Sequence, residues 1–104
     1  MAAHIVANLH FYMPNEGGRK VAVSPPHFGC VFEIGGQSHD CRLLLPNAKP
    51  IRPGDTVRLP IQFVFPKLVL PKLSLGQKFF LWELGHIAEG EVIEILNINN
   101  SDRR

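Results

Sequence analysis

Residues 50–96 read PIRPGDTVRLPIQFVFPKLVLPKLSLGQKFFLWELGHIAEGEVIEIL, and this stretch decides the fold. It opens at residues 50–56 with a turn rich in Pro and Gly. In the segment that follows, apolar residues take every second position, the period of a strand with one buried face: Val57, Leu59, Ile61, Phe63 and Phe65. Residues 79–84 and 87–96 are two further strands, and the short turn at residues 85–86 requires them to pair antiparallel. Together these segments describe half of a small closed barrel.

The first half of the chain carries similar signals. Residues 5–13 alternate between apolar and polar side chains, and residues 27–34 and 38–45 flank a Gly-Gly turn as the two strands of a hairpin. Two prolines restrict residues 67–73, so we expect an extended connector there rather than a helix. Six or seven strands without a helix predict an all-β chain folded as an antiparallel barrel or sandwich.

Two residues inside the expected strands carry local predictions. Pro60 has no backbone N–H to donate, so its nitrogen should lie at an edge or a bulge. Gly90 stands in the middle of the last strand, which predicts a bulge or a close backbone approach.

Length and composition indicate one domain. The chain has 104 residues, of which 45% are hydrophobic, and this suits a single modest core. We assign residues 1–96 to the barrel domain and residues 97–104 to a polar C-terminal tail. The formal net charge is +2, which is too small to indicate a nucleic-acid binder. Residues 1–78 carry nine Lys/Arg and four Asp/Glu, a sum of +5, and residues 79–104 carry two and five, a sum of −3.

The cysteines and the N-terminus indicate a compartment. Cys30 and Cys41 are too few for a secreted disulfide scaffold. The N-terminal residues lack the charged segment and apolar run of a signal peptide, and no apolar run approaches the ~20 residues of a spanning helix. We therefore expect a cytoplasmic protein with reduced thiols and no membrane contact.

The sequence lacks the usual motifs of nucleotide binding and catalysis. It contains no GxxxxGK[ST] phosphate loop, no GxGxxG after a strand and no GxSxG elbow. His39, Asp40 and Cys41 bring three reactive residue types together, but on a strand the aspartate faces away from the other two. We expect no enzymatic activity, no nucleotide, no cofactor and no metal. An enzyme using His39 and Cys41 is the least favoured alternative.

Other groups of polar and aromatic residues have structural interpretations. His4 and His10 share a face, but six strand residues separate them by ~20 Å, too far for one ion. Glu89 and Glu91 share a face of the last strand, which we expect to be solvated. The aromatic residues mostly fall at core positions, which favours packing over a base-stacking platform: Phe11, Phe28, Phe32, Phe63, Phe65, Phe79, Phe80 and Trp82.

Four motifs follow one another along the chain: FYMPNEGGR at residues 11–19, PHFGCVF at 26–32, RPGD at 52–55 and KFFLWELGHIAEGEV at 78–92. In this order they resemble the C-terminal β-barrel, domain III, of translation elongation factor Tu. The first is similar to its early strand and EGGR turn, the second to its proline–aromatic strand, and the third to its PGD turn. The last resembles the family's ending, R-F-x-[IL]-R-E-G-G-R…G-x-G-V. The resemblance covers about residues 4–96.

The resemblance implies a six-stranded, antiparallel, closed β-barrel. In the full factor this barrel packs against the GTPase domain and a second barrel, contacts the T-stem of aminoacyl-tRNA and meets the exchange factor. The GTPase motifs are missing here, so GTP hydrolysis is not implied. Residues 83–86, ELGH, stand where the family has a second EGGR, and residues 24–28 lack the arginine of the family's G-[YF]-R-P-Q-F segment.

A non-catalytic module that binds a protein or RNA partner of the translation machinery is the function that the resemblance implies. Its predicted contact residues are the retained EGGR turn and nearby basic side chains: Glu16, Gly17, Gly18, Arg19, Lys20, Arg52 and Arg58. The turn also has a purely structural interpretation, in which two glycines build the reversal and Arg19 reaches a carboxylate such as Glu16. The alternative function is a ligand-binding or self-associating barrel, a homo-oligomer unrelated to translation.

Overall fold

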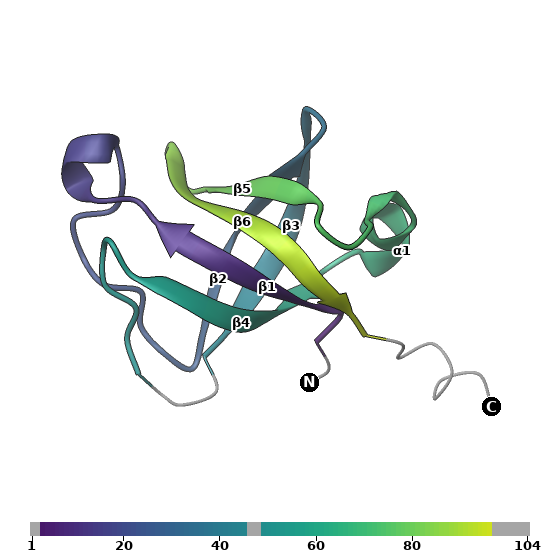
Figure 1. Cartoon of the computed structure of the whole chain (residues 1–104). Coiled ribbons are helices and arrows are strands. Elements are labelled where there is room, and N and C mark those ends of the chain that lie inside the picture. Colours follow the sequence, from purple (N-terminus) through teal and green to yellow (C-terminus); the bar gives the residue numbers. More distant parts are fainter. Residues whose placement is uncertain (1–2, 46–48, 97–104) are drawn as a thin grey trace.

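The computed structural model describes residues 3–45 and 49–96, and these residues form six strands: β1 (Ile5–Phe11), β2 (His27–Ile34), β3 (Gln37–Leu44), β4 (Thr56–Phe63), β5 (Lys78–Trp82) and β6 (His86–Ile95). All neighbouring strands are antiparallel, and they close into a barrel in the order β1-β4-β3-β2-β5-β6 (Figure 1). The all-β barrel is therefore confirmed over the sandwich. The tail predicted at residues 97–104 lies outside the described residues.

Alternating side chains fill the inside of the barrel, as the period of a strand requires. Every strand contributes fully buried apolar residues: Ile5 and Leu9 of β1, Phe32 of β2, Leu43 of β3, Ile61 of β4, Phe79 and Leu81 of β5, and Val92 of β6. The Phe32 ring stacks on Phe79 with centroids 4.2 Å apart and meets Phe63 edge-on at 4.9 Å. Such pairs stabilise the core beyond their burial alone.

Gly90 lies where β6 passes closest to this core. A Cβ built on Gly90 would lie 2.7 Å from Leu9 Cδ2 and 2.7 Å from Phe79 Cε1. Real Cβ atoms do not approach other heavy atoms so closely, so glycine lets two large side chains from the neighbouring strands meet there. The approach at Gly90 is made by side chains and not by a second backbone, and the register shifts of β6 lie elsewhere.

Pro60 occupies a position where its missing N–H is not needed. It is opposite Val6 in the β1–β4 register, and the carbonyl of the next residue, Ile61, accepts a hydrogen bond from His4 on the β1 side. Main-chain groups of successive strand residues point to opposite sides, so the Pro60 nitrogen faces β3. The β3–β4 register ends one pair earlier, at Leu43 and Ile61. Pro60 therefore lies just beyond the end of the β3–β4 hydrogen-bond ladder, and this is the edge position that the sequence predicted.

The connector between β4 and β5 corrects one expectation. Instead of an extended segment it forms a one-turn helix, α1 (Pro66–Val69), and a 3₁₀ turn, η2 (Leu70–Lys72). Each has a proline in its first two positions, where the absent N–H costs no helical hydrogen bond. The prolines therefore start two short turns. A third turn, η1 (Pro14–Glu16), begins in the same way.

Three aromatic residues that we expected in the core are exposed. Phe65 is 58% exposed because β4 ends at Phe63 and the alternation does not continue beyond it. Phe80 and Trp82 are 45% and 39% exposed because they occupy the outward positions of β5.

The two ends of the barrel carry different segments (Figure 1). The turns at residues 13–20, 50–55 and 83–85 gather at one end, which we call the EGGR end. The opposite end carries α1 and η2, and we call it the α1 end. No helix in the described part of the chain is long and apolar enough to cross a membrane.

Candidate functional site

The turn at residues 13–20 is built by its backbone and its glycines. The Glu16 carboxylate accepts a hydrogen bond from the Met13 N–H at 2.8 Å. Gly17 has a φ of 95°, in the left-handed region that favours glycine. A Cβ on Gly18 would lie 2.9 Å from the Cβ of Tyr12, so a larger residue does not fit. The tight reversal predicted at the two glycines is confirmed.

Arg19 ties this turn to the rest of the EGGR end. Its guanidinium forms an ion pair with Glu83 and lies over the Phe28 ring, 4.8 Å from the centroid. Its Nε also donates to the Val21 carbonyl at 3.3 Å, and only 20% of its side chain is exposed. Arg19 does reach a carboxylate, but the partner is Glu83 of the β5–β6 turn and not Glu16. These contacts favour the structural interpretation of Arg19.

The turn at residues 50–55 lies against the first one. Gly54 has a φ of 92°, and a Cβ there would lie 2.6 Å from the sulfur of Met13. The Asp55 carboxylate accepts a hydrogen bond from the Arg52 N–H at 2.8 Å and closes the turn. The Arg52 side chain is exposed.

Most of the predicted contact residues therefore come together at the EGGR end: Glu16, Gly17, Gly18, Arg19, Lys20 and Arg52. Lys20 and Arg52 are exposed there, whereas Arg19 is occupied by Glu83. Arg58 does not join them. It lies on the wall of the barrel, opposite Asn8 in the β1–β4 register.

Sequence reasoning missed a row of outward apolar side chains that ends at the EGGR end, Phe80, Trp82 and Leu84, which we call the β5 row. Leu84 is 94% exposed and has a φ of 58°, which is uncommon for a residue other than glycine. The signal for Phe80 and Trp82 was present in the sequence, because residues that alternate with buried Phe79 and Leu81 along a strand must point outward. Leu84 lies in the turn beyond β5, where this alternation does not apply. Large contiguous patches of exposed apolar side chains are where binding surfaces are sought.

Polar and charged groups border the β5 row. The His86 Nε2 atom lies 2.8 Å from a Glu33 carboxylate oxygen, and the His86 ring centroid is 5.1 Å from that of Phe80. Glu89 is opposite Phe80 in the β5–β6 register and accepts a hydrogen bond from the Tyr12 hydroxyl at 3.0 Å. Burial, followed by this contact with Glu89, raises the pKa of Tyr12 to about 12. The phenol is therefore a neutral donor at physiological pH.

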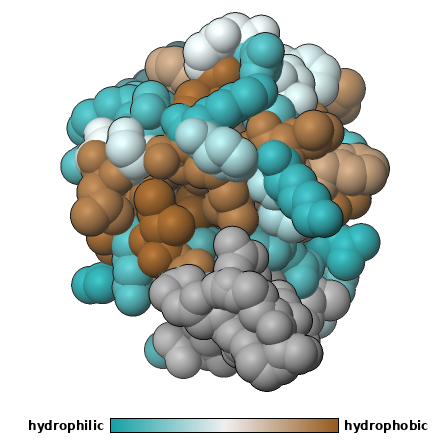
Figure 2. Space-filling view, turned by 90° about the vertical axis from the view of Figure 1, so that its right-hand side faces the viewer, coloured by the Kyte–Doolittle hydropathy of each residue, from teal (hydrophilic) through white to brown (hydrophobic). Residues whose placement is uncertain are grey.

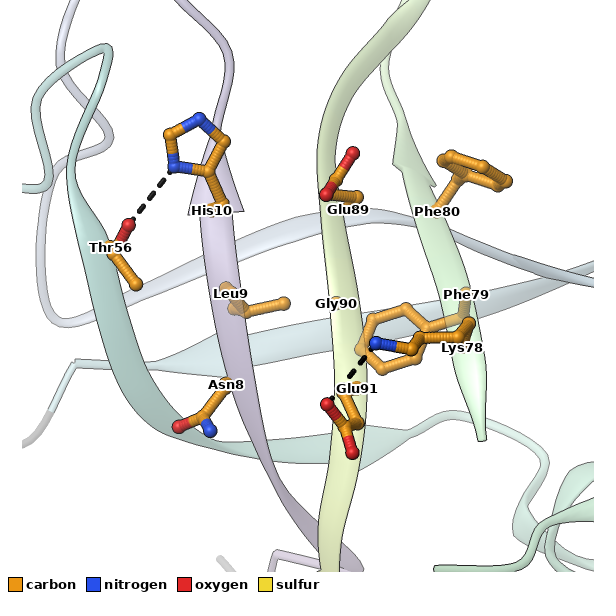
Figure 3. Close-up of a pocket in the computed structure, with 10 residues that line it drawn as sticks. All are labelled: Asn8, Leu9, His10, Thr56, Lys78, Phe79, Phe80, Glu89, Gly90 and Glu91. Atoms are coloured by element: carbon orange, nitrogen blue, oxygen red, sulfur yellow. Dashed lines mark hydrogen bonds and ion pairs between the residues drawn. The ribbon is translucent and has the colours of Figure 1, made fainter. Parts of the chain in front are cut away.

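A hollow of about 400 Å³ lies on the barrel wall beside Phe80 (Figure 3). Side chains from β1, β4, β5 and β6 line it, and several of their polar groups are paired. The Lys78 ammonium is 3.3 Å from a Glu91 oxygen, and His10 Nδ1 is 3.0 Å from the Thr56 hydroxyl. Neither pair sets a base against a reactive nucleophile with an orienting third group. Glu89 and Glu91 are part of this open surface, as predicted.

The thiol of Cys41 faces another thiol rather than a base. Its Sγ lies 3.7 Å from the Sγ of Cys30, and this contact, followed by burial, raises the pKa of Cys41. The neighbouring His39 has a lowered pKa, mainly because of burial. In the described residues no three His, Cys, Asp or Glu side chains are grouped so that they could hold a metal ion.

Comparison with known proteins gives no family. A scan of the sequence against protein-family models found no match, and a search of curated proteins found none. The function is therefore argued from the geometry of the barrel and from the motifs of the sequence.

Proposed function

We propose that this chain is a non-catalytic binding barrel that docks onto a protein of the translation apparatus through its EGGR end and the adjoining β5 row. The observation that carries the proposal is Leu84, an apolar side chain 94% exposed at the tip of a tight turn. Exposed Trp82 and Phe80 continue the row from it. Aromatic and large apolar side chains in contact with charged neighbours are typical of the centre of protein interfaces.

The charges of the EGGR end favour a protein partner over RNA. Three cations and three carboxylates belong to its turns: Arg19, Lys20 and Arg52 against Glu16, Asp55 and Glu83. Arg19 is already paired with Glu83. Binding to a phosphate backbone needs an excess of unpaired cations, and it weakens steeply with salt. A balanced surface with an apolar centre is better suited to a protein.

The connection to translation rests on the resemblance to the elongation factor Tu barrel. In that family the barrel contacts other proteins, the GTPase domain and the exchange factor among them. The turns at residues 16–19 and 83–86, which stand where the family has its two EGGR turns, are joined here by the Arg19–Glu83 ion pair. We place the protein in the cytoplasm, with no cofactor and no nucleotide of its own.

Affinity capture from the native host tests this function. Aspartate tolerates the left-handed backbone of Leu84, so Leu84→Asp removes the apolar tip without new strain. Leu68→Asp at the α1 end, where Leu68 is 60% exposed, is the matched control. We expect the wild type and Leu68→Asp to capture a translation protein even after ribonuclease treatment, and Leu84→Asp to lose it. Capture of RNA alone, or equal capture by both variants, would refute the proposal.

Self-association is the second candidate, and the α1 end favours it. Hydrophobic residues gather on the face that carries this end in Figure 2. The segments between β4 and β5 supply large exposed apolar side chains: Val64, Phe65, Leu68 and Leu75. A homo-oligomer through this end predicts a concentration-dependent mass by light scattering that Phe65→Asp abolishes. A monomeric mass at every concentration would exclude it.

A further inference from the structure

Two cysteines lie directly opposite each other in the β2–β3 hairpin. The register pairs Cys30 with Cys41, and their Sγ atoms are 3.7 Å apart. Both thiols are free. Directly opposite residues of antiparallel strands have Cα atoms ~4.5–5.5 Å apart. A disulfide needs roughly 4.4–6.8 Å, so the backbone already has the separation that a bond between these sulfurs requires.

The two thiols differ in their access to solvent. Cys41 is 2% exposed and belongs to the core, whereas Cys30 is only partly buried. A hollow of about 350 Å³ opens at this place, and both cysteines line it together with Val64 and Arg42. The β2–β5 register covers only Val31 to Glu33, so no β5 residue is paired with Cys30. A small molecule can therefore meet Cys30 first.

We propose that Cys30 and Cys41 form a thiol–disulfide exchange site, which a small disulfide such as glutathione disulfide converts into an intramolecular cross-strand disulfide. The Cys30 thiolate attacks one sulfur of the reagent, whose S–S bond breaks and releases one thiolate. Cys41 then gives up its proton and attacks the Cys30 sulfur of the mixed disulfide, which releases the second thiol. Two protein thiols are oxidised to one disulfide, and the reagent is reduced to two thiols.

The difference in burial fixes the order of these steps. The attacking group must be a thiolate that solvent and reagent can reach. The contact with Cys30 and burial raise the pKa of Cys41, so this thiol does not compete for the external reagent. Once Cys30 carries the mixed disulfide, Cys41 is the adjacent thiol in the β2–β3 register, and the intramolecular step does not depend on protein concentration.

Intact-mass measurement on the folded protein tests the site. With glutathione disulfide the wild type should lose two hydrogens, retain no glutathione and return to its starting mass with a reductant. Cys41→Ser should stop with one glutathione on Cys30, and Cys30→Ser should react far more slowly. Peptide mapping of the oxidised wild type locates the bond, so the result does not depend on whether either variant folds.

Three outcomes would overturn the proposal: a wild type that keeps both thiols, one that retains glutathione on Cys30, or one that forms disulfides only between molecules. The oxidised hairpin should also unfold at a higher denaturant concentration than the reduced one, because a disulfide restricts the unfolded chain. An oxidised protein that is no more stable than the reduced one would show that the bond distorts the barrel.

Discussion

At the scale of single residues, the barrel depends on positions where only one kind of side chain fits. Gly90 allows Leu9 and Phe79 to meet across β6, and Gly18 lies against Tyr12. His4 is buried just before β1, and its Nδ1 accepts a hydrogen bond from the Phe63 N–H at 2.9 Å. His4 is therefore a structural group whose ring nitrogen has a hydrogen-bond partner.

Gly90→Ala should destabilise the protein by about 1–3 kcal/mol, because the added methyl overpacks the core. Gly29→Ala is the matched control, since a Cβ there would meet only the Cys41 carbonyl oxygen at 3.9 Å. It should change stability by less than about 0.5 kcal/mol. Urea unfolding of the three proteins measures both effects, and equal midpoints for the two variants would show that the packing around Gly90 is loose.

The stability of the protein should fall as the pH is lowered below 6.5. Burial lowers the pKa of His4 from its ordinary value of 6.5, so the unfolded chain takes up a proton at a higher pH than the folded chain. The stability that His4 contributes is therefore fully present above pH 6.5, and this contribution is lost as the pH falls toward the folded pKa of His4. His39, whose pKa is also lowered, acts in the same direction.

His4→Asn tests this dependence, because an amide oxygen can accept the Phe63 N–H without titrating. The free energy of unfolding, measured by urea between pH 5 and pH 8, should vary less with pH in the variant than in the wild type. The same slope in both proteins would mean that His4 does not titrate differently on folding. These pH limits are chosen to span roughly one to two units on each side of the ordinary histidine pKa.

At the scale of elements, the turns at the EGGR end hold one another in place. Arg19 connects the turn at residues 13–20 to the β5–β6 turn through Glu83 and covers Phe28. The turn at residues 50–55 packs against Met13. The motifs that carry the resemblance thus meet in space, although more than sixty residues separate Arg19 from Glu83 along the chain.

A double-mutant cycle with Arg19→Ala and Glu83→Gln should give a coupling free energy of about 0.5–1 kcal/mol that decreases with added salt. The Arg19 side chain is 20% exposed, so the pair is less screened than one on the open surface. Lys78 and Glu91, 78% and 42% exposed, form the control pair. Their coupling should be close to zero, and a larger coupling in that pair would contradict the argument from burial.

At the scale of the whole molecule, closure of the barrel makes the first and last strands neighbours. β1 lies between β4 and β6, and the Leu96 N–H donates to the His4 carbonyl at 2.9 Å beyond the end of the pair. The closed ring leaves no strand with a whole edge unpaired, although the β2–β5 register covers only Val31 to Glu33. Loss of one strand would open two edges and expose the core.

A chain that ends after Leu96 should therefore keep the fold, whereas one that ends before His86 should not fold. The first retains all six strands found in the described residues, and the second lacks β6, which buries Ile87, Ala88 and Val92. Near-ultraviolet circular dichroism and urea unfolding distinguish them. A shorter chain that still unfolds cooperatively would show that β6 is not essential to the barrel.

The sequence by itself determined the strands, because alternation with period two shows in the chain and needs no knowledge of its neighbours. It also located the glycine reversal at residues 17–18. The sequence predicted an extended connector at residues 67–73, and this prediction was wrong. A proline can end one helix or begin another, and the choice depends on what the buried Val69 packs against.

Only the tertiary structure decided which distant side chains meet. Barrel closure and register paired Arg19 with Glu83 and set Cys30 beside Cys41. Periodicity states which residues share a face of one strand, but it does not state which strand lies next to it. The physical reason is that pairing between strands is fixed by the packing of all the side chains that share the core.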